Sequence, residues 1–297
     1  MSDELEQFEK ALMSKDEKTL VSLTTKHTNE ERVKLRADYQ AKFGRDLLKD
    51  FDSKLGSDFK NCMVGLYKPA DEYNADLLYY AMKGIGSNKE VISEVLSFGS
   101  ADDIKAMKAK FQEKYKNDLV AEVKSETSGD YQKIVLALLD GNRGTNSSPD
   151  VQSCANIAKE IFELGDGKGD LSVFVKYFPT LSKDELLIVC KEYHKNHNKN
   201  ILDTIDKKFS GNERDLLKII LYGMYSPAEY FAKVIHSAVA GAGTSDDKLI
   251  RCFISRAEKD MPKIKKYYKK LYNVEMEEDI KGDLSGNYLD TILGLMK

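Results

Sequence analysis

Leu284-Ser285-Gly286, close to the end of the 297-residue chain, precedes apolar residues at Tyr288, Ile292, Leu295 and Met296. Spacings of three and four residues place such side chains on one face of a helix. A glycine followed by the same one-sided helical pattern occurs three more times, at Lys54-Leu55-Gly56, Thr127-Ser128-Gly129 and Phe209-Ser210-Gly211. The sequence therefore predicts four internal repeats.

The repeats are predicted to be helical throughout. The chain has only five prolines and 19 glycines, and strict apolar/polar alternation is almost absent, which excludes a strand-rich protein. A length of roughly 70 to 75 residues gives each repeat about five short helices. The turn-rich junctions Lys68-Pro69, Asp140 to Pro149 and Ser226-Pro227 predict repeats at 1–68, 69–143, 150–225 and 226–297.

Composition excludes several classes of function. Lys and Arg number 46 against 49 Asp and Glu, and the net charge of −3 argues against a strongly basic nucleic-acid binder. No stretch approaches the roughly 20 apolar residues that span a bilayer, and Met1 to Glu4 is acidic, unlike a signal peptide, so we expect an intracellular protein. The four cysteines are expected to be reduced core thiols. No nucleophile–base pair, phosphate-binding loop or metal-hydrolase motif is visible, so an enzyme is not expected.

Two loops between predicted helices carry the pattern Gly-x-Gly. They read Met82-Lys83-Gly84-Ile85-Gly86-Ser87 and Val239-Ala240-Gly241-Ala242-Gly243-Thr244. A carboxylate follows 40 positions after the second glycine in both, as Glu126 and as Asp283. The hydroxyls that end the loops also begin the patterns Ser87-x-x-Glu90 and Thr244-x-x-Asp247, which, like Ser100-x-x-Asp103, predict capping of a helix N-terminus.

These loops have the composition of a calcium site. Glycines allow backbone conformations in which carbonyl oxygens converge on one point, and a bidentate carboxylate completes an oxygen set that suits Ca²⁺. One negative charge against two positive leaves positions for water or for a phosphate oxygen. Each loop alone could be a plain tight connection between helices, but two copies with one spacing favour calcium.

The chain resembles the annexins over essentially its whole length. The resemblance is carried by the four repeats, by the loop Met82 to Ser87 with Glu126, and by the runs Phe253 to Met261 and Asp283 to Tyr288. It implies the annexin fold, a slightly curved disc of four five-helix repeats that binds anionic phospholipid in the presence of calcium. It also implies type II calcium sites in repeats 2 and 4, with the metal ligands Met82, Gly84, Gly86 and Glu126, and Val239, Gly241, Gly243 and Asp283.

Repeats 1 and 3 depart from that pattern. In repeat 1 the loop is the shorter Leu12 to Glu17 and the carboxylate position falls on Ser53 or Lys54, so no such calcium site is expected. Repeat 3 keeps a glycine loop, Gly165 to Asp170, but Lys208 stands at the carboxylate position. Asp166 and Asp170 could then supply only a looser site. The short first repeat and the degenerate repeats also resemble the divergent protist annexins called alpha-giardins.

The predicted function is calcium-dependent binding to a membrane of phosphatidylserine-like anionic phospholipid. Lys83, Ile85 and Ala242 are expected to contact the headgroups, and repeat 2 is expected to be the stronger anchor because Ala240 replaces Lys83 in repeat 4. The expected location is cytoplasmic, on the inner face of the plasma membrane, with a link to the cytoskeleton. The alternative that stays open is a calcium-independent scaffold protein that binds cytoskeletal filaments. The sequence does not indicate the oligomeric state.

Overall fold

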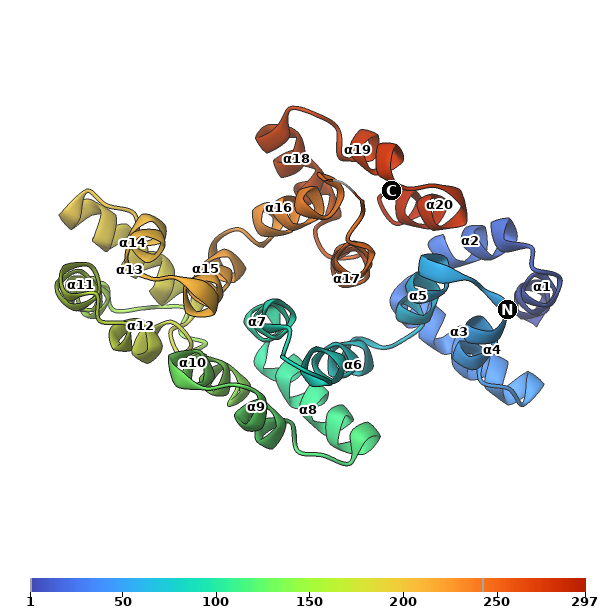
Figure 1. Ribbon diagram of the computed structural model, residues 1–297, viewed down its shortest axis with the longest axis horizontal. Coiled ribbons are helices and arrows are strands. Elements are labelled where there is room, and N and C mark those ends of the chain that lie inside the picture. The colour runs from blue at the N-terminus through green and yellow to red at the C-terminus, as the bar shows by residue number, and fades with distance from the viewer. Residues whose placement is uncertain (1, 242) are drawn as a thin grey trace. The chain divides into compact units, whose positions relative to one another are not determined.

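The computed structural model describes residues 2–241 and 243–297. Within these two ranges the chain forms helices and no strand, which confirms the all-α prediction. The helices group into two compact units, Met1–Ala70 with Ala228–Lys297 (unit 1) and Asp71–Pro227 (unit 2). The first and last parts of the chain, blue and red in Figure 1, therefore belong to one unit.

Unit 1 contains the helices of repeats 1 and 4. Those of repeat 1 are α1 (Ser2–Ser14), α2 (Glu17–Thr25), α3 (Asn29–Phe43), α4 (Leu47–Lys54) and α5 (Ser57–Leu66). Those of repeat 4 are α16 (Pro227–Val239), α17 (Asp246–Arg256), α18 (Met261–Tyr272), α19 (Met276–Asp283) and α20 (Gly286–Gly294).

Unit 2 contains the helices of repeats 2 and 3. Those of repeat 2 are α6 (Ala70–Met82), α7 (Lys89–Phe98), α8 (Ala101–Tyr115), α9 (Leu119–Glu126) and α10 (Gly129–Leu139). Repeat 3 comprises α11 (Val151–Glu160), the π-helix η1 (Ile161–Gly167), α12 (Ser172–Tyr177), α13 (Lys183–His197), α14 (Ile201–Lys208) and α15 (Gly211–Tyr225). Repeat 3 thus differs from the others in its π-helix and in the short α12.

The repeats pack through helices that are far apart in the sequence. In unit 1 α2 of repeat 1 lies against α20 of repeat 4, and a Cβ added to Gly294 would come within 2.5 Å of Thr25 Cγ2. In unit 2 α7 of repeat 2 lies against α15 of repeat 3, where a Cβ added to Gly223 would meet the Ser97 carbonyl oxygen at 3.2 Å. Glycine fits at both positions because the Thr25 side chain lies against Gly294 and the Ser97 backbone lies against Gly223.

The fourth helix of each repeat positions the candidate site. Helices α4, α9, α14 and α19 each have eight residues, and they end on Lys54, Glu126, Lys208 and Asp283. Side chains cap the first three at their N-termini, from Asp46, Asp118 and Asn200. Two extended residues and then a residue with positive φ follow the helix, so the chain turns sharply into the next helix.

None of the described helices is both long and apolar enough to span a membrane.

Candidate metal centre

The Gly-x-Gly loop of repeat 2 connects α6 to α7. It is closed by a hydrogen bond from the Asn88 amide to the Ala81 carbonyl, 2.7 Å long, which encloses the last residue of α6 and residues 83–87 of the connection. Gly84 has a φ of +109° and Gly86 a φ of +81°, and a Cβ at either position would meet no atom within 4 Å. Glycine is required here by backbone conformation and not by space.

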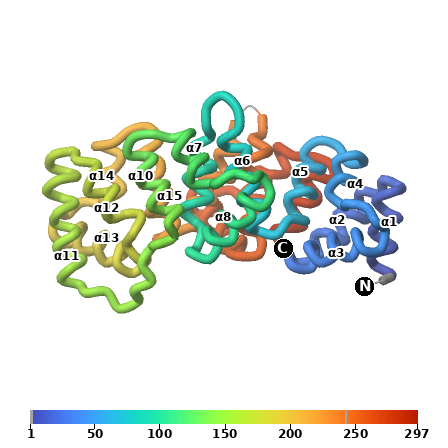
Figure 2. The backbone as a smooth tube through the Cα atoms, turned by 90° about the horizontal axis from the view of Figure 1, so that it is seen from below, coloured from blue at the N-terminus to red at the C-terminus, as the bar shows by residue number. Residues whose placement is uncertain are grey.

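The loop projects from unit 2. In Figure 2 it stands out beside α6 and α7, and the side chain of Ile85 is fully exposed. Lys83 folds back toward the end of α6, with its ammonium 5.4 Å from the ring centre of Tyr79 and 5.9 Å from that of Tyr80. The exposed end of repeat 2 therefore combines one apolar and one cationic side chain.

The same loop is joined to the helix that ends in the carboxylate. The Ser87 hydroxyl donates a hydrogen bond of 3.1 Å to the backbone carbonyl of Glu126. The predicted capping by Ser87 is therefore wrong: the N-cap of α7 is Asn88, whose Oδ1 accepts from the Val91 amide at 3.2 Å. The Ser87 hydroxyl does not cap α7 because it donates to the carbonyl at the C-terminal end of α9.

The loop of repeat 4 repeats this construction. The Ser245 amide donates to the Ala238 carbonyl at 2.9 Å, and Gly243 has a φ of +95°. The Thr244 hydroxyl donates to the carboxylate Oδ2 of Asp283, so the predicted capping by Thr244 is also wrong. Ala242 lies outside the described residues.

The third capping prediction is confirmed. The Ser100 hydroxyl accepts from the Asp103 amide at 3.1 Å, and the Asp103 carboxylate accepts from the Ser100 amide at 2.9 Å. Ser100 differs from Ser87 and Thr244 because its hydroxyl donates, at 2.7 Å, to Asp103 in the first turn of the helix that it caps.

The carbonyl oxygens of repeat 2 remain open to a ligand. Within residues 2–241 and 243–297, no hydrogen bond reaches the carbonyls of Met82, Gly84 or Gly86. Across the same described ranges, no three His, Cys, Asp or Glu side chains gather in a way that could hold a metal ion. The donor set that the loop offers is therefore made of backbone carbonyls near one carboxylate, which is a hard-oxygen set suited to Ca²⁺.

Repeat 1 lacks this geometry. Its first connection is closed by a hydrogen bond from the Asp16 amide to the Ala11 carbonyl, 2.8 Å long, over only five positions. The residue with positive φ after α4 is Ser57 at +50°, where repeats 2 and 4 have Gly129 and Gly286. This register assigns the carboxylate position to Lys54 and not to Ser53.

Repeat 3 uses its aspartates for other contacts. The Asp170 amide closes the connection onto the Leu164 carbonyl at 3.0 Å, one position shorter than in repeat 2. The side chain of Asp166 is 8% exposed and forms an ion pair with Lys199, while Asp170 accepts from the Ser172 amide at 2.9 Å. Lys208 ends α14. The two aspartates therefore do not converge on a common point.

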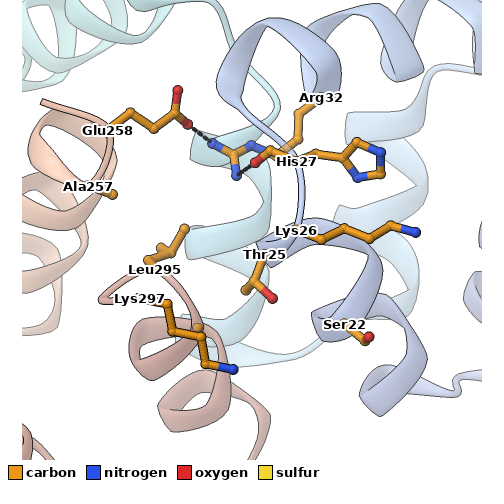
Figure 3. A pocket seen from close by; sticks show the side chains of 10 residues that line it. Ser22, Thr25, Lys26, His27, Arg32, Ala257, Glu258, Leu295 and Lys297 are labelled. Atoms are coloured by element: carbon orange, nitrogen blue, oxygen red, sulfur yellow. Dashed lines mark hydrogen bonds and ion pairs between the residues drawn. The ribbon is translucent and has the colours of Figure 1, made fainter.

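Unit 1 also holds a cavity of about 350 Å³ at the other end of its helices (Figure 3). It lies where α2, α17 and α20 end, away from the loops at which α2 and α17 begin. The Arg32 side chain, 3% exposed, donates to Glu258 at 2.7 Å and also to the carbonyls of Thr24, His27 and Leu66. Because Arg32 neutralises the carbonyl ends of two helices, its role here is structural.

Comparison with known proteins agrees with this geometry. The family model described as Annexin matches residues 2–66, 73–138 and 230–295. These ranges fall in repeats 1, 2 and 4. Annexin A5 of Homo sapiens is 34% identical over 280 residues, which cover 94% of this chain and 88% of the relative.

Solved structures show the same fold. Annexin III has a TM-score of 0.94 and 30% identity, and the match covers 99% of this chain and 93% of that chain. Calcium-bound alpha-14 giardin has a TM-score of 0.86 at 20% identity, over 99% of this chain and 98% of that chain, which shows a shared fold alone. Four helical repeats, two glycine loops that each close over seven positions and these similarities together show that the chain belongs to the annexin family.

Proposed function

We propose that this annexin binds Ca²⁺ through the loops of repeats 2 and 4 and that the bound ions hold it on anionic phospholipid. Annexins are membrane-binding proteins that act with calcium and are generally not enzymes. The observation that carries the proposal is the pair of hydroxyl contacts, Ser87 to Glu126 and Thr244 to Asp283, because each fixes a carboxylate-bearing helix end beside a glycine loop.

In repeat 2 the ligands would be the carbonyl oxygens of Met82, Gly84 and Gly86 with the carboxylate of Glu126. The carbonyls have no donor among the described residues, and the left-handed glycines turn the backbone without strain. In repeat 4 the equivalent ligands would be Val239, Gly241, Gly243 and Asp283. A bound Ca²⁺ would supply the positive charge that attracts a lipid phosphate.

The expected affinity for calcium alone is low. Each site has one carboxylate, and sites of few charges bind Ca²⁺ with dissociation constants on the order of 10⁻⁴ M or weaker. A lipid phosphate would complete the coordination shell and raise the affinity. Because two sites belong to one chain, binding at one raises the effective concentration of lipid for the other, so binding should be steep in calcium.

Repeat 2 should be the stronger of the two anchors. Ile85 is fully exposed at its tip and Lys83 lies one residue before Gly84, whereas repeat 4 has Ala240 in place of the lysine. A lysine near an anionic surface adds about 1 kcal/mol to binding. We also propose headgroup contact for Ala242 by analogy with Ile85.

The proposed lipid is of the phosphatidylserine type, and the proposed location is the inner face of the plasma membrane, with a link to cytoskeletal filaments. These proposals extend the calcium mechanism to the anionic leaflet of a cell. A negatively charged lipid surface would attract the sites when calcium is bound and repel the same sites without calcium, because each carries a carboxylate.

Co-sedimentation with phosphatidylserine vesicles across a calcium titration tests the function. We expect binding that appears with calcium and reverses with chelator, and a roughly tenfold higher calcium requirement for Glu126→Gln. Glu122→Gln, one turn earlier on α9, is the matched control because it removes the same charge. Equal titrations for the two variants would contradict the assignment of Glu126.

Sedimentation with filaments, beside the vesicle assay, distinguishes the scaffold alternative from calcium-dependent membrane binding. A folded protein that sediments with filaments in chelator and ignores vesicles at millimolar calcium would establish the calcium-independent scaffold in its place.

A further inference from the structure

The fourth helices of the repeats end at one structural position with two kinds of charge. Each has eight residues, and the next residue is extended and donates its amide back to the last turn of the helix. Glu126 and Asp283 occupy the last position in repeats 2 and 4, and Lys54 and Lys208 occupy it in repeats 1 and 3. Repeats 1 and 3, whose first connections are shorter, therefore carry a cation and not a neutral residue there.

Neither lysine is neutralised by a nearby acid. Lys208 is exposed and Lys54 is half-exposed, and in the part of the chain that the structure describes no ion pair or side-chain hydrogen bond involves either ammonium group. Lys199, in contrast, forms an ion pair with Asp166 of the same repeat. The charges of Lys54 and Lys208 are thus available to an external anion.

Each unit has one fourth helix that ends on a lysine and one that ends on a carboxylate, and in both units the helices that follow these two pack against each other. In unit 1, α5 begins three residues after Lys54 and packs against α20, which begins three residues after Asp283. In unit 2, α15 begins three residues after Lys208 and packs against α10, which begins three residues after Glu126.

The two kinds of end become equivalent in charge when calcium binds. A Ca²⁺ ion with one carboxylate carries a net charge of about +1, which is the charge of one lysine ammonium. A compact ammonium with three donors binds phosphate oxygens as a point charge. Repeats 1 and 3 would then present a charge of about +1 at the end of the fourth helix at all times, whereas repeats 2 and 4 would present it only with calcium bound.

We propose that Lys54 and Lys208 replace bound calcium in repeats 1 and 3 and contact the phosphates of anionic lipids directly, without a metal. The inference deepens the proposed function and rests on it. Repeats 2 and 4 then switch binding on with calcium, while repeats 1 and 3 supply a constant, salt-sensitive attraction.

A lysine at a helix C-terminus also has a purely structural use. It interacts favourably with the negative end of the helix dipole, and that effect would change the melting temperature but not the partition onto vesicles. Vesicle binding therefore discriminates between the two roles, and the melting temperature serves as the control for folding.

The test compares two double variants with equal loss of charge. Lys54→Gln/Lys208→Gln removes the proposed contacts. Lys183→Gln/Lys259→Gln removes two exposed lysines, the first residue of α13 and a residue of the connection before α18, at the opposite ends of α12 and α17 from the glycine loops. Each protein is mixed with vesicles of phosphatidylserine and phosphatidylcholine, or of phosphatidylcholine alone, across a calcium titration and in chelator at low ionic strength.

We expect the first variant to lose roughly fivefold in vesicle partition per lysine, about 25-fold for the pair, and the second to stay within about twofold of the unmodified protein. Lys54→Arg/Lys208→Arg should retain binding because it keeps the charge. Equal partition of the two glutamine variants would overturn the inference and leave the calcium mechanism standing. Lysine-dependent binding that ignores calcium would support the inference and overturn the calcium mechanism, and no vesicle binding under any condition would overturn both.

Discussion

Repeats 2 and 3 belong to the same unit, yet their first connections differ in chemistry. In repeat 2 the connection is closed from residue 88 back to residue 81, and the carbonyls between them stay open. In repeat 3 it is closed from residue 170 back to residue 164, a π-helix takes up the glycines, and Lys199 pairs with Asp166. The first connection of repeat 3 is thus one position shorter than that of repeat 2 and lacks its open loop, although both repeats share the helical fold.

Repeats 4 and 1 show the same contrast in unit 1. The connection of repeat 4 is closed from residue 245 to residue 238, and that of repeat 1 from residue 16 to residue 11. The long connections accompany a carboxylate at the end of the fourth helix, and the short ones accompany a lysine. The length of the first connection and the charge of the last residue of the fourth helix therefore vary together, as expected if both belong to one binding site.

Removing both carboxylates should give the largest effect. Glu126→Gln/Asp283→Asn makes repeats 2 and 4 resemble repeats 1 and 3 in lacking an anionic ligand, so calcium-dependent vesicle binding should fall roughly 100-fold or more. Vesicle co-sedimentation at fixed calcium measures it. Full binding by this double variant would show that the ions bind elsewhere and would remove the contrast between the repeats.

A smaller effect is expected at the opposite end of unit 1, on stability alone. Glu258→Ala leaves the buried Arg32 without its carboxylate and the Asn29 amide without its acceptor, and should lower the free energy of unfolding by about 2 kcal/mol. Chemical denaturation measures the loss, with Asp290→Ala, an exposed residue of α20, as control. The calcium concentration at half-maximal vesicle binding should stay the same. A change in that concentration for a variant that is still folded would contradict the independence of this end of unit 1 from the glycine loops.

The glycines of repeat 4 allow a test within one loop. Gly243→Ala forces alanine to a φ of +95°, which costs about 1 kcal/mol and should weaken calcium binding roughly fivefold. Gly241 has no positive φ and open space around it, so Gly241→Ala should be tolerated. Isothermal titration with calcium and vesicles compares the two. Equal losses would mean that the carbonyls of this loop are set by something other than glycine conformation.

The smallest effect is expected in repeat 3. Asp166 is held by Lys199, so Asp166→Asn should change the calcium requirement for vesicle binding by less than twofold. A calcium titration of vesicle binding measures it, with Asp170→Asn as the companion variant. A large increase in the requirement would reveal a calcium site in repeat 3 and reduce the difference from repeat 2.

The sequence alone predicted the helical class, the four repeats and the resemblance to annexins. These features depend on local periodicity, on the glycine loops and on the 40-residue spacing to Glu126 and Asp283, all of which can be counted along the chain. The same spacing indicated that a carboxylate belongs with each loop. The ligand assignments themselves stay predictions.

Tertiary structure decided what depends on contacts between distant segments. Ser87 and Thr244 look like helix caps in sequence, but α9 and α19 pass over them and take their hydroxyls. The left-handed residue after α4 is Ser57 and not Gly56, which selects Lys54 over Ser53. Lys199 reaches Asp166 across 33 positions. Short-range patterns specify which helix forms, whereas the partner of a polar side chain depends on which segment the fold brings beside it.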